Sequence, residues 1–237
     1  MDTLRTRLDQ LLLYCYRQVY GNRILAPFIT NQFYKLYYAS SRRTWHGNTT
    51  WFGTQLLKNP FDMWVYQELI HRIQPDAIIE CGTYNGGSAR YFASLCDLLD
   101  NGKILTIDIE EREGRPQHER VTYYRGSSIA NETIDMVQEF IAGSQRVLVI
   151  LDSDHSRDHV LAEMRLYGQF VTDNSYMIVE DGCVNGHPVL PFYGPGPLEA
   201  IRLFLKEDDT FEIDKACEKF YFTFNPSGYL RKLPSKS

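Results

Sequence analysis

The sequence predicts an α/β fold built on a doubly wound, mostly parallel sheet with a helical N-terminal extension. From residue 59 onward, short apolar runs of strand length alternate with longer stretches of helical periodicity. The runs are continuously apolar, which is typical of parallel strands covered by helices on both faces. The last part of the chain breaks this alternation and predicts an antiparallel C-terminal hairpin.

The individual elements follow in chain order. Asn59 can cap a helix with Pro60 at its first position, and apolar side chains then recur at every fourth residue from Phe61. Strands are expected over residues 77–81, 103–107, 121–124, 147–151 and 176–179, and helices over residues 88–99, 131–141, 157–170 and 197–205. The closing hairpin is expected to join residues 211–213 to residues 220–224.

The domain division expected is a helical and aromatic extension over residues 1–58 and one main domain over residues 59–237. Amphipathic helices in residues 1–45 favour packing on the main domain or on a sister subunit of a homo-oligomer, and peripheral contact with a membrane surface is the alternative. The longest apolar run of the N-terminus, residues 11–16, is far shorter than a transmembrane segment, and no secretory signal is evident.

Charge and cysteine content limit the classes of binding partner and the cellular compartment that we expect. The net charge of −5 and the pI of about 5.7 give no global basic field, so nucleic acid is not expected as a partner. The five cysteines show no C-x-x-C spacing, which predicts reduced thiols and a cytoplasmic protein. A small-molecule or glycan ligand is the remaining expectation.

Acidic residues follow two of the predicted strands. Asp152 ends the apolar run of residues 147–151, and Glu180 and Asp181 end the run of residues 176–179. In an open α/β sheet these carboxyl ends form the ligand crevice, where three converging carboxylates would repel one another unless a cation lay between them. Oxygen ligands in a partly hydrated site suit Mg²⁺. Strand-end acids that merely face solvent are the alternative.

A glycine-containing loop follows the first strand of the sheet. Gly82 permits a tight turn, Gly86 and Gly87 allow close approach of a ligand, and Ser88 can cap the next helix. The spacing differs from G-x-G-x-x-G, which disfavours a nicotinamide-dependent oxidoreductase. Glu80, two residues before the first glycine, suits a cationic amino-acid ligand better than a pyrophosphate.

Asp108 ends the second strand, where an acid typically binds ribose hydroxyls. The alternatives are a buried Glu80 that the turn amides satisfy and an Asp108 that faces solvent.

These residues resemble a known family, the cephalosporin hydroxylase/rhamnosyl O-methyltransferase family of class I S-adenosylmethionine-dependent methyltransferases. The resemblance extends from about residue 51 onward. It is densest in residues 79–88 (IECGTYNGGS), 151–155 (LDSDH) and 179–189 (VEDGCVNGHPV). It implies a Rossmann-like fold.

The resemblance also assigns the site residues. The methionine part of the cofactor would be held by Glu80, Gly82, Tyr84, Asn85, Gly86 and Ser88; Asp108 would hold the ribose, and Ser127 and Ser128 would lie beside the adenine. Asp152, Glu180 and Asp181 match the metal ligands of cation-dependent O-methyltransferases. Those relatives carry a Lys as base three residues after the first metal Asp, where this chain has His155.

The function expected is a Mg²⁺- and S-adenosylmethionine-dependent O-methyltransferase acting on a sugar hydroxyl of a glycolipid, polysaccharide or glycosylated natural product. Asp152 and His155 are the candidate catalytic residues, with His155 as general base, because imidazole accepts a proton near neutral pH. A histidine bonded to Asp154 or Asp158 is the alternative for His155. For the whole chain, the alternative is a non-catalytic accessory subunit of a biosynthetic complex.

Overall fold

The computed structural model describes residues 2–22 and 24–235, and it divides the chain into compact units of residues 1–40 and 41–237. The first unit holds α1 (Asp2–Tyr20) and α2 (Leu25–Ala39). The Asn22 side chain accepts a hydrogen bond from the Ile24 amide at 2.8 Å just before α2 begins. Within the described residues, neither helix of this unit nor any other is long and apolar enough to cross a membrane.

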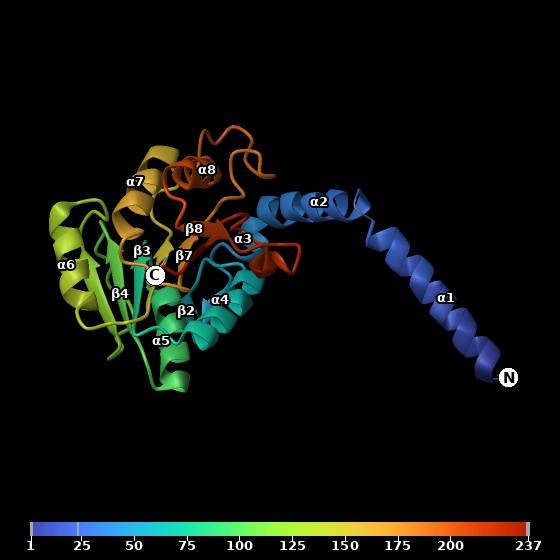
Figure 1. The fold of residues 1–237 in the computed structure, drawn as a ribbon, viewed down its shortest axis with the longest axis horizontal. Helices are drawn as coiled ribbons and strands as arrows, with labels where there is room; N and C mark the ends of the chain where they lie inside the picture. The colour runs from blue at the N-terminus through green and yellow to red at the C-terminus, as the bar shows by residue number, and fades with distance from the viewer. Residues whose placement is uncertain (1, 23, 236–237) are drawn as a thin grey trace. The chain divides into compact units, whose positions relative to one another are not determined.

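The second unit is built on a seven-stranded sheet in the order β5-β4-β3-β6-β7-β9-β8 (Figure 1). The first five strands in this order are parallel, and β9 runs antiparallel to both β7 and β8. The strands are β3 (Ala77–Cys81), β4 (Lys103–Asp108), β5 (Val121–Arg125), β6 (Val147–Leu151), β7 (Tyr176–Val179), β8 (Phe211–Ile213) and β9 (Tyr229–Lys232). The predicted doubly wound, mostly parallel sheet is confirmed.

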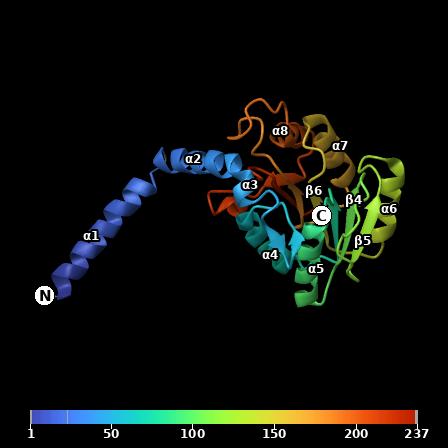
Figure 2. The ribbon, with the colours of Figure 1, turned by 180° about the vertical axis from the view of Figure 1, so that it is seen from behind.

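Helices cover both faces of this sheet. The helices of this unit are α3 (Ser41–Thr44), α4 (Pro60–Ile73), α5 (Gly87–Leu99), α6 (Asn131–Ile141), α7 (Arg157–Tyr167) and α8 (Pro197–Glu207), with a 3₁₀ turn η1 (Lys215–Glu218) and a small ladder of β1 (Thr50–Trp51) and β2 (Thr54–Gln55). One apolar cluster joins α6, α7 and α8 to one face, and a second joins α4 and α5 to the other. Figure 2 shows α4 and α5 on one side of the sheet and α6 and α7 on the other. Alternate strand residues face opposite clusters, so all residues of β3, β6 and β7 are buried.

The start of α4 follows the sequence prediction. Asn59 Oδ1 accepts a hydrogen bond from the Phe61 amide at 3.1 Å, and Pro60 occupies the first helical position. This cap fixes the direction in which the chain enters the helix, and it therefore also fixes the residue just before the cap, Lys58.

The predicted hairpin partner is wrong. Residues 220–224 form turns and irregular chain, and the strand that pairs with β8 is β9. The physical reason is Asp62 on α4, whose carboxylate accepts hydrogen bonds from the Thr223 hydroxyl and, at 2.8 Å, from the Phe224 amide. The Phe224 amide is thereby bonded to a side chain and does not donate to a neighbouring strand.

The strand order positions the site. β3 lies between β4 and β6, so the chain changes its direction of winding at this point. Ligand crevices of open α/β sheets lie outside the carboxyl ends of the strands at such a reversal. The carboxyl ends of β3, β4, β6 and β7 carry Glu80, Asp108, Asp152 and Glu180, respectively.

Candidate active site

The ends of β6 and β7 bring acidic side chains together. One ligand atom each from Asp152, His155 and Asp181 lies within 4.8 Å of the other two. Glu180, the first residue after β7, is only 5% exposed. We refer to Asp152, Glu180 and Asp181 as the carboxylate centre. The predominantly oxygen donor set fits the preference of Mg²⁺.

Burial shapes the ionisation of this centre. Burial raises the pKa of Glu180 well above its usual range, and the negative charge of Asp152 raises it further. Burial also raises the pKa of Asp181, while the neighbouring His155 opposes that rise. Both shifts express the cost of gathering negative charges away from water, which a nearby cation relieves.

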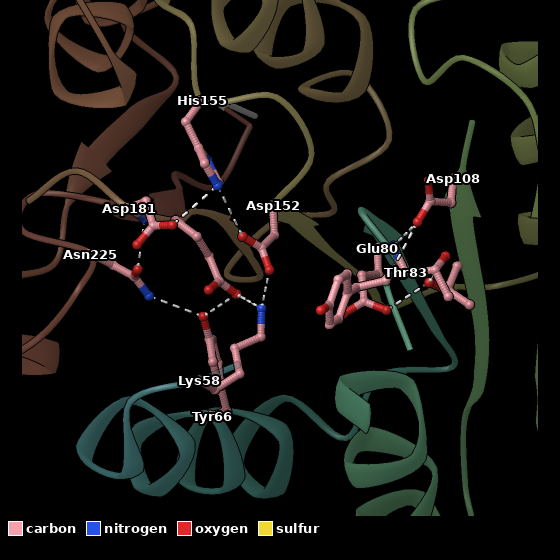
Figure 3. A network of polar contacts seen from close by, with 12 residues as sticks. Lys58, Tyr66, Glu80, Thr83, Asp108, Asp152, His155, Asp181 and Asn225 are labelled. Atoms are coloured by element: carbon pink, nitrogen blue, oxygen red, sulfur yellow. Dashed lines mark hydrogen bonds and ion pairs between the residues drawn. The ribbon is translucent and has the colours of Figure 1, made fainter. Parts of the chain in front are cut away.

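Lys58 provides one such positive charge. Its Nζ atom donates to Asp152 Oδ2 at 2.5 Å and also to Glu180 Oε1 (Figure 3). Burial alone would lower the pKa of Lys58, but the charges of Asp152, Glu180 and Glu80 raise it above its usual range. The ammonium ion is therefore the stable form, and it bridges two members of the carboxylate centre.

A buried polar network supports the same carboxylates from α4 and the C-terminal segment. The Tyr66 hydroxyl donates to Glu180 Oε1 at 2.7 Å and accepts from Asn225 Nδ2 at 3.0 Å. Asn225 Oδ1 in turn accepts from the Asp181 amide at 3.2 Å. Tyr66 and Asn225 are both almost fully buried, so they hold the pair at the end of β7 in a fixed orientation.

His155 lies on the partly exposed side of the centre. Its Nε2 atom is 3.1 Å from Asp181 Oδ2 and 3.9 Å from Asp152 Oδ1. The nearest acidic partner of His155 Nε2 is thus Asp181. The two alternative partners have other contacts, since Asp154 accepts from the Ser156 amide and Asp158 pairs with Arg157. The imidazole is about one quarter exposed and can contact a ligand.

Glu80 lies inside β3, next to the carboxylate centre. It is 0% exposed, and its Oε2 atom accepts from the Thr106 hydroxyl at 2.7 Å. Within the described part of the chain, its Oε1 atom has no hydrogen-bond partner. Burial raises the pKa of Glu80 to about 7, although the charge of Lys58 and the hydroxyls of Ser88 and Thr106 oppose the rise. A buried carboxylate with an unused oxygen fits a cationic ligand.

The loop after β3 packs directly against β6. Gly82 has a φ of +101°, and a Cβ atom there would lie 1.9 Å from the Asp152 carbonyl oxygen. Tyr84 also has positive φ, and Asn85 Nδ2 donates to Gln55 Oε1 at 2.5 Å. Gly86 precedes α5 as its N-cap. The predicted cofactor loop and the carboxylate centre are therefore neighbours.

Asp108 organises this loop. Its Oδ2 atom accepts from the amides of Thr83 and Tyr84, at 3.2 and 2.8 Å, and from Arg115 at 3.2 Å. Its Oδ1 atom accepts from the Glu110 amide at 2.9 Å. Asp108 is thus well supplied with donors, and a ribose hydroxyl would have to join or replace them.

The adenine-side residues follow β5. Ser128 is 5% exposed, its hydroxyl lies 3.2 Å from His159 Nε2, and its carbonyl accepts from the Tyr167 hydroxyl at 2.8 Å. Ser127 begins the turn that leads into α6, since its carbonyl accepts from the Ala130 amide at 3.0 Å. These bonds fix the segment beside the ends of β4 and β5.

The sequence prediction did not find Lys58, Tyr66 and Asn225. Lys58 immediately precedes a helix cap, where a lysine has no special meaning in the sequence. Tyr66 falls on the buried side of α4, and a tyrosine at such a position usually indicates packing. Only the packing of α4 and of the C-terminal segment against the end of β7 gives these side chains their place in the centre.

The strand order and the loop after β3 form a Rossmann-like fold, which this chain shares with a solved structure of a putative O-methyltransferase. The chain belongs to the rhamnosyl O-methyltransferase/CmcI family, whose sequence profile matches residues 43–233. The predicted resemblance and the expected class of enzyme, an O-methyltransferase, are confirmed.

Curated relatives of the chain include rhamnosyl O-methyltransferases from Mycobacterium. The protein from Mycobacterium tuberculosis is 38% identical over 212 residues, which cover 85% of this chain and 84% of the relative. The protein from Mycobacterium leprae is also 38% identical, over 210 residues that cover 85% of this chain and 90% of the relative.

Two solved structures share the fold. An apo structure of CmcI aligns with a TM-score of 0.61 at 22% identity and covers 79% of this chain and 77% of its own. A putative caffeoyl-CoA O-methyltransferase from Staphylococcus aureus aligns with a TM-score of 0.54 at 14% identity and covers 95% of this chain and 99% of its own.

Proposed function

We propose that this protein transfers the methyl group of S-adenosylmethionine to a hydroxyl group of a sugar, in a reaction that requires Mg²⁺. The observation that carries the proposal is the meeting of Asp152, Asp181 and His155 beside the loop after β3, with the buried Glu180 joined to Asp152 through Lys58. The sugar is supported by the rhamnosyl O-methyltransferases at 38% identity. The metal is supported by the donor set and by CmcI, which has been described with Mg and SAM.

The proposed cofactor contacts follow the ends of β3, β4 and β5. Glu80 Oε1 would accept from the cationic amino group of the cofactor, and Asp108 would bind its ribose. Gly82 keeps the loop close to the backbone of Asp152, so a cofactor bound along the loop would lie next to the carboxylate centre. Ser127 and Ser128 would lie beside the adenine.

The proposed chemistry is an in-line displacement at the sulfonium methyl group, for which alignment of the acceptor hydroxyl supplies much of the rate. A bound Mg²⁺ would lower the pKa of that hydroxyl. His155 would take up the hydroxyl proton, and Asp181, whose Oδ2 atom lies 3.1 Å from His155 Nε2, would stabilise the resulting imidazolium. Tyr66 and Asn225 would keep Glu180 and the Asp181 backbone in place during the reaction.

The test is methyl transfer from labelled S-adenosylmethionine to rhamnosides, measured with Mg²⁺ and with EDTA. We expect EDTA to abolish transfer and Mg²⁺ to restore it. Asp152→Ala should abolish transfer while cofactor affinity changes by no more than a few-fold, because the proposed metal serves the acceptor. Asp158→Asn, at an exposed acid nearby, is the matched control and should behave as the wild type. Full turnover of the wild type in EDTA would contradict the metal assignment.

His155→Gln tests the proposed base. We expect the rate at saturating substrates to fall by about 10²–10⁴-fold, with the affinity for cofactor and metal retained. The wild-type rate should rise with pH through an inflection that the variant lacks. A loss under about tenfold with an intact pH profile would mean that His155 only orients Asp152 or Asp181. Binding of S-adenosylhomocysteine without transfer to any acceptor would favour the accessory-subunit alternative.

A further inference from the structure

Lys58 is built into the carboxylate centre although it lies outside the motifs that predict this centre. Its side chain is only 4% exposed. Figure 3 shows that it approaches Asp152 from the side opposite to His155. Asp152 Oδ2 bonds to Lys58, whereas Asp152 Oδ1 lies 3.9 Å from His155 Nε2. The two oxygens of one carboxylate thus face different cationic or polar groups.

The charges around Lys58 show what a lysine contributes at this position. Three carboxylates and one imidazole meet at the ends of β6 and β7, and two of these carboxylates contact the same ammonium group. Removing one partner of a buried ion pair leaves an uncompensated charge, which is strongly unfavourable. Without Lys58, Asp152 and Glu180 would repel each other, and Tyr66 alone would hold Glu180 from the side of α4.

We propose that Lys58 is a positioning residue that holds Asp152 and Glu180 together in the metal-free enzyme and lowers the affinity of the centre for Mg²⁺. The inference rests on the proposed Mg²⁺ site and deepens it. Lys58 and a metal ion would contact the same two carboxylates, so the effect of Lys58 on stability depends on whether the metal is bound. The ammonium stabilises the empty site, and the same positive charge repels an incoming divalent cation.

The dependence on Mg²⁺ distinguishes the proposed role of Lys58 from ordinary core packing. A lysine that only fills space would contribute equally to stability with and without Mg²⁺. A lysine that supplies charge to the metal site would matter most when the metal is absent, because the metal replaces the missing charge. Thermal unfolding and Mg²⁺ affinity measure this difference without reference to catalysis.

The experiment compares Lys58→Met with the wild type in EDTA and in Mg²⁺. We expect the variant to melt roughly 10 °C below the wild type in EDTA and to recover more than half of that loss in Mg²⁺. By titration calorimetry its Kd for Mg²⁺ should fall by about tenfold, because one opposing charge is gone. Lys58→Arg, which keeps the charge, should restore most of the stability in EDTA.

Lys103→Met is the matched control. Lys103 donates to the Phe140 carbonyl and lies 4.5 Å above the Phe140 ring, so its loss should lower the melting temperature equally with and without Mg²⁺. The same pattern in Lys58→Met, with unchanged Mg²⁺ affinity, would overturn the proposal for Lys58 alone.

Three further outcomes are informative. A Lys58→Met variant that folds only in Mg²⁺ would support the proposal, and one that folds in neither condition would overturn it. If the wild type is neither bound nor stabilised by Mg²⁺, the proposed metal dependence fails first, and the role of Lys58 fails with it.

Discussion

Glu80→Gln removes a charge from the buried end of β3 with almost no change in volume. The carboxylate is 0% exposed, its Oε1 atom has no hydrogen-bond partner within the described residues, and burial raises its pKa to about 7. If this oxygen receives the cationic amino group of the cofactor, as proposed, cofactor affinity must depend on the ionisation of Glu80.

The direction and size of the pH dependence of cofactor affinity follow from the pKa of Glu80. A bound cation favours the ionised carboxylate and lowers its pKa, so binding releases a proton and affinity rises with pH until it levels off above about pH 7. With a pKa of about 7 in the free protein, S-adenosylhomocysteine should bind about tenfold more weakly at pH 6 than at pH 8. Glu80→Gln should remove this dependence and weaken binding at pH 8 by about 1.5–3 kcal/mol.

The assay is titration calorimetry with S-adenosylhomocysteine from pH 6 to pH 8, repeated in buffers with different heats of ionisation to count the released protons. Glu163→Gln is the control. Glu163 is equally buried and also has an unpartnered oxygen within the described residues, but its other oxygen accepts from Ser153 at 2.6 Å. The Glu163→Gln variant should keep the pH dependence of S-adenosylhomocysteine affinity seen in the wild type. A wild-type affinity that is flat with pH, or an unchanged affinity in Glu80→Gln, would refute the reasoning.

Two other substitutions test the loop after β3. Asp108→Ala should weaken cofactor binding by about 1.5–3 kcal/mol, measured by calorimetry, with little change in the maximal rate. An unchanged affinity would mean that Asp108 only organises the Thr83 and Tyr84 amides. Gly82→Ala should lower the free energy of unfolding in urea by more than about 4 kcal/mol, because the new Cβ atom meets the Asp152 carbonyl. Gly114→Ala, also at positive φ but with no atom within 4 Å, should cost only about 1–2 kcal/mol, and equal losses would contradict the steric argument.

The sheet was largely predictable because its strands are continuously apolar. The predicted strands at residues 77–81, 147–151 and 176–179 match β3, β6 and β7, and the predicted helix at residues 131–141 matches α6. The C-terminal segment was not predictable, because residues 220–224 carry the aromatic and β-branched pattern of a strand. Their actual structure depends on Asp62, which lies more than 150 residues earlier in the chain.

The acids of the candidate site were predictable for a different reason. Asp108, Asp152 and Glu180 each end a strand, and parallel strands bring their carboxyl ends to one edge of the sheet. The donors that hold these acids were not predictable. Lys58 and Tyr66 come from α4 and the residues before it, and their contacts depend on how that helix packs across the sheet, which no local pattern encodes.

The network around Asp62 has a consequence for the order in which the protein is assembled. Asp62 Oδ1 accepts from the Tyr229 hydroxyl at 2.8 Å, and Tyr229 begins β9, the strand that inserts between β7 and β8. During synthesis, β3, β6 and β7 emerge from the ribosome well before β9 does. Until then, Asp62 lacks its C-terminal donors and Tyr66 lacks Asn225. The carboxylates therefore acquire their final surroundings only after residues 223–229 have been made.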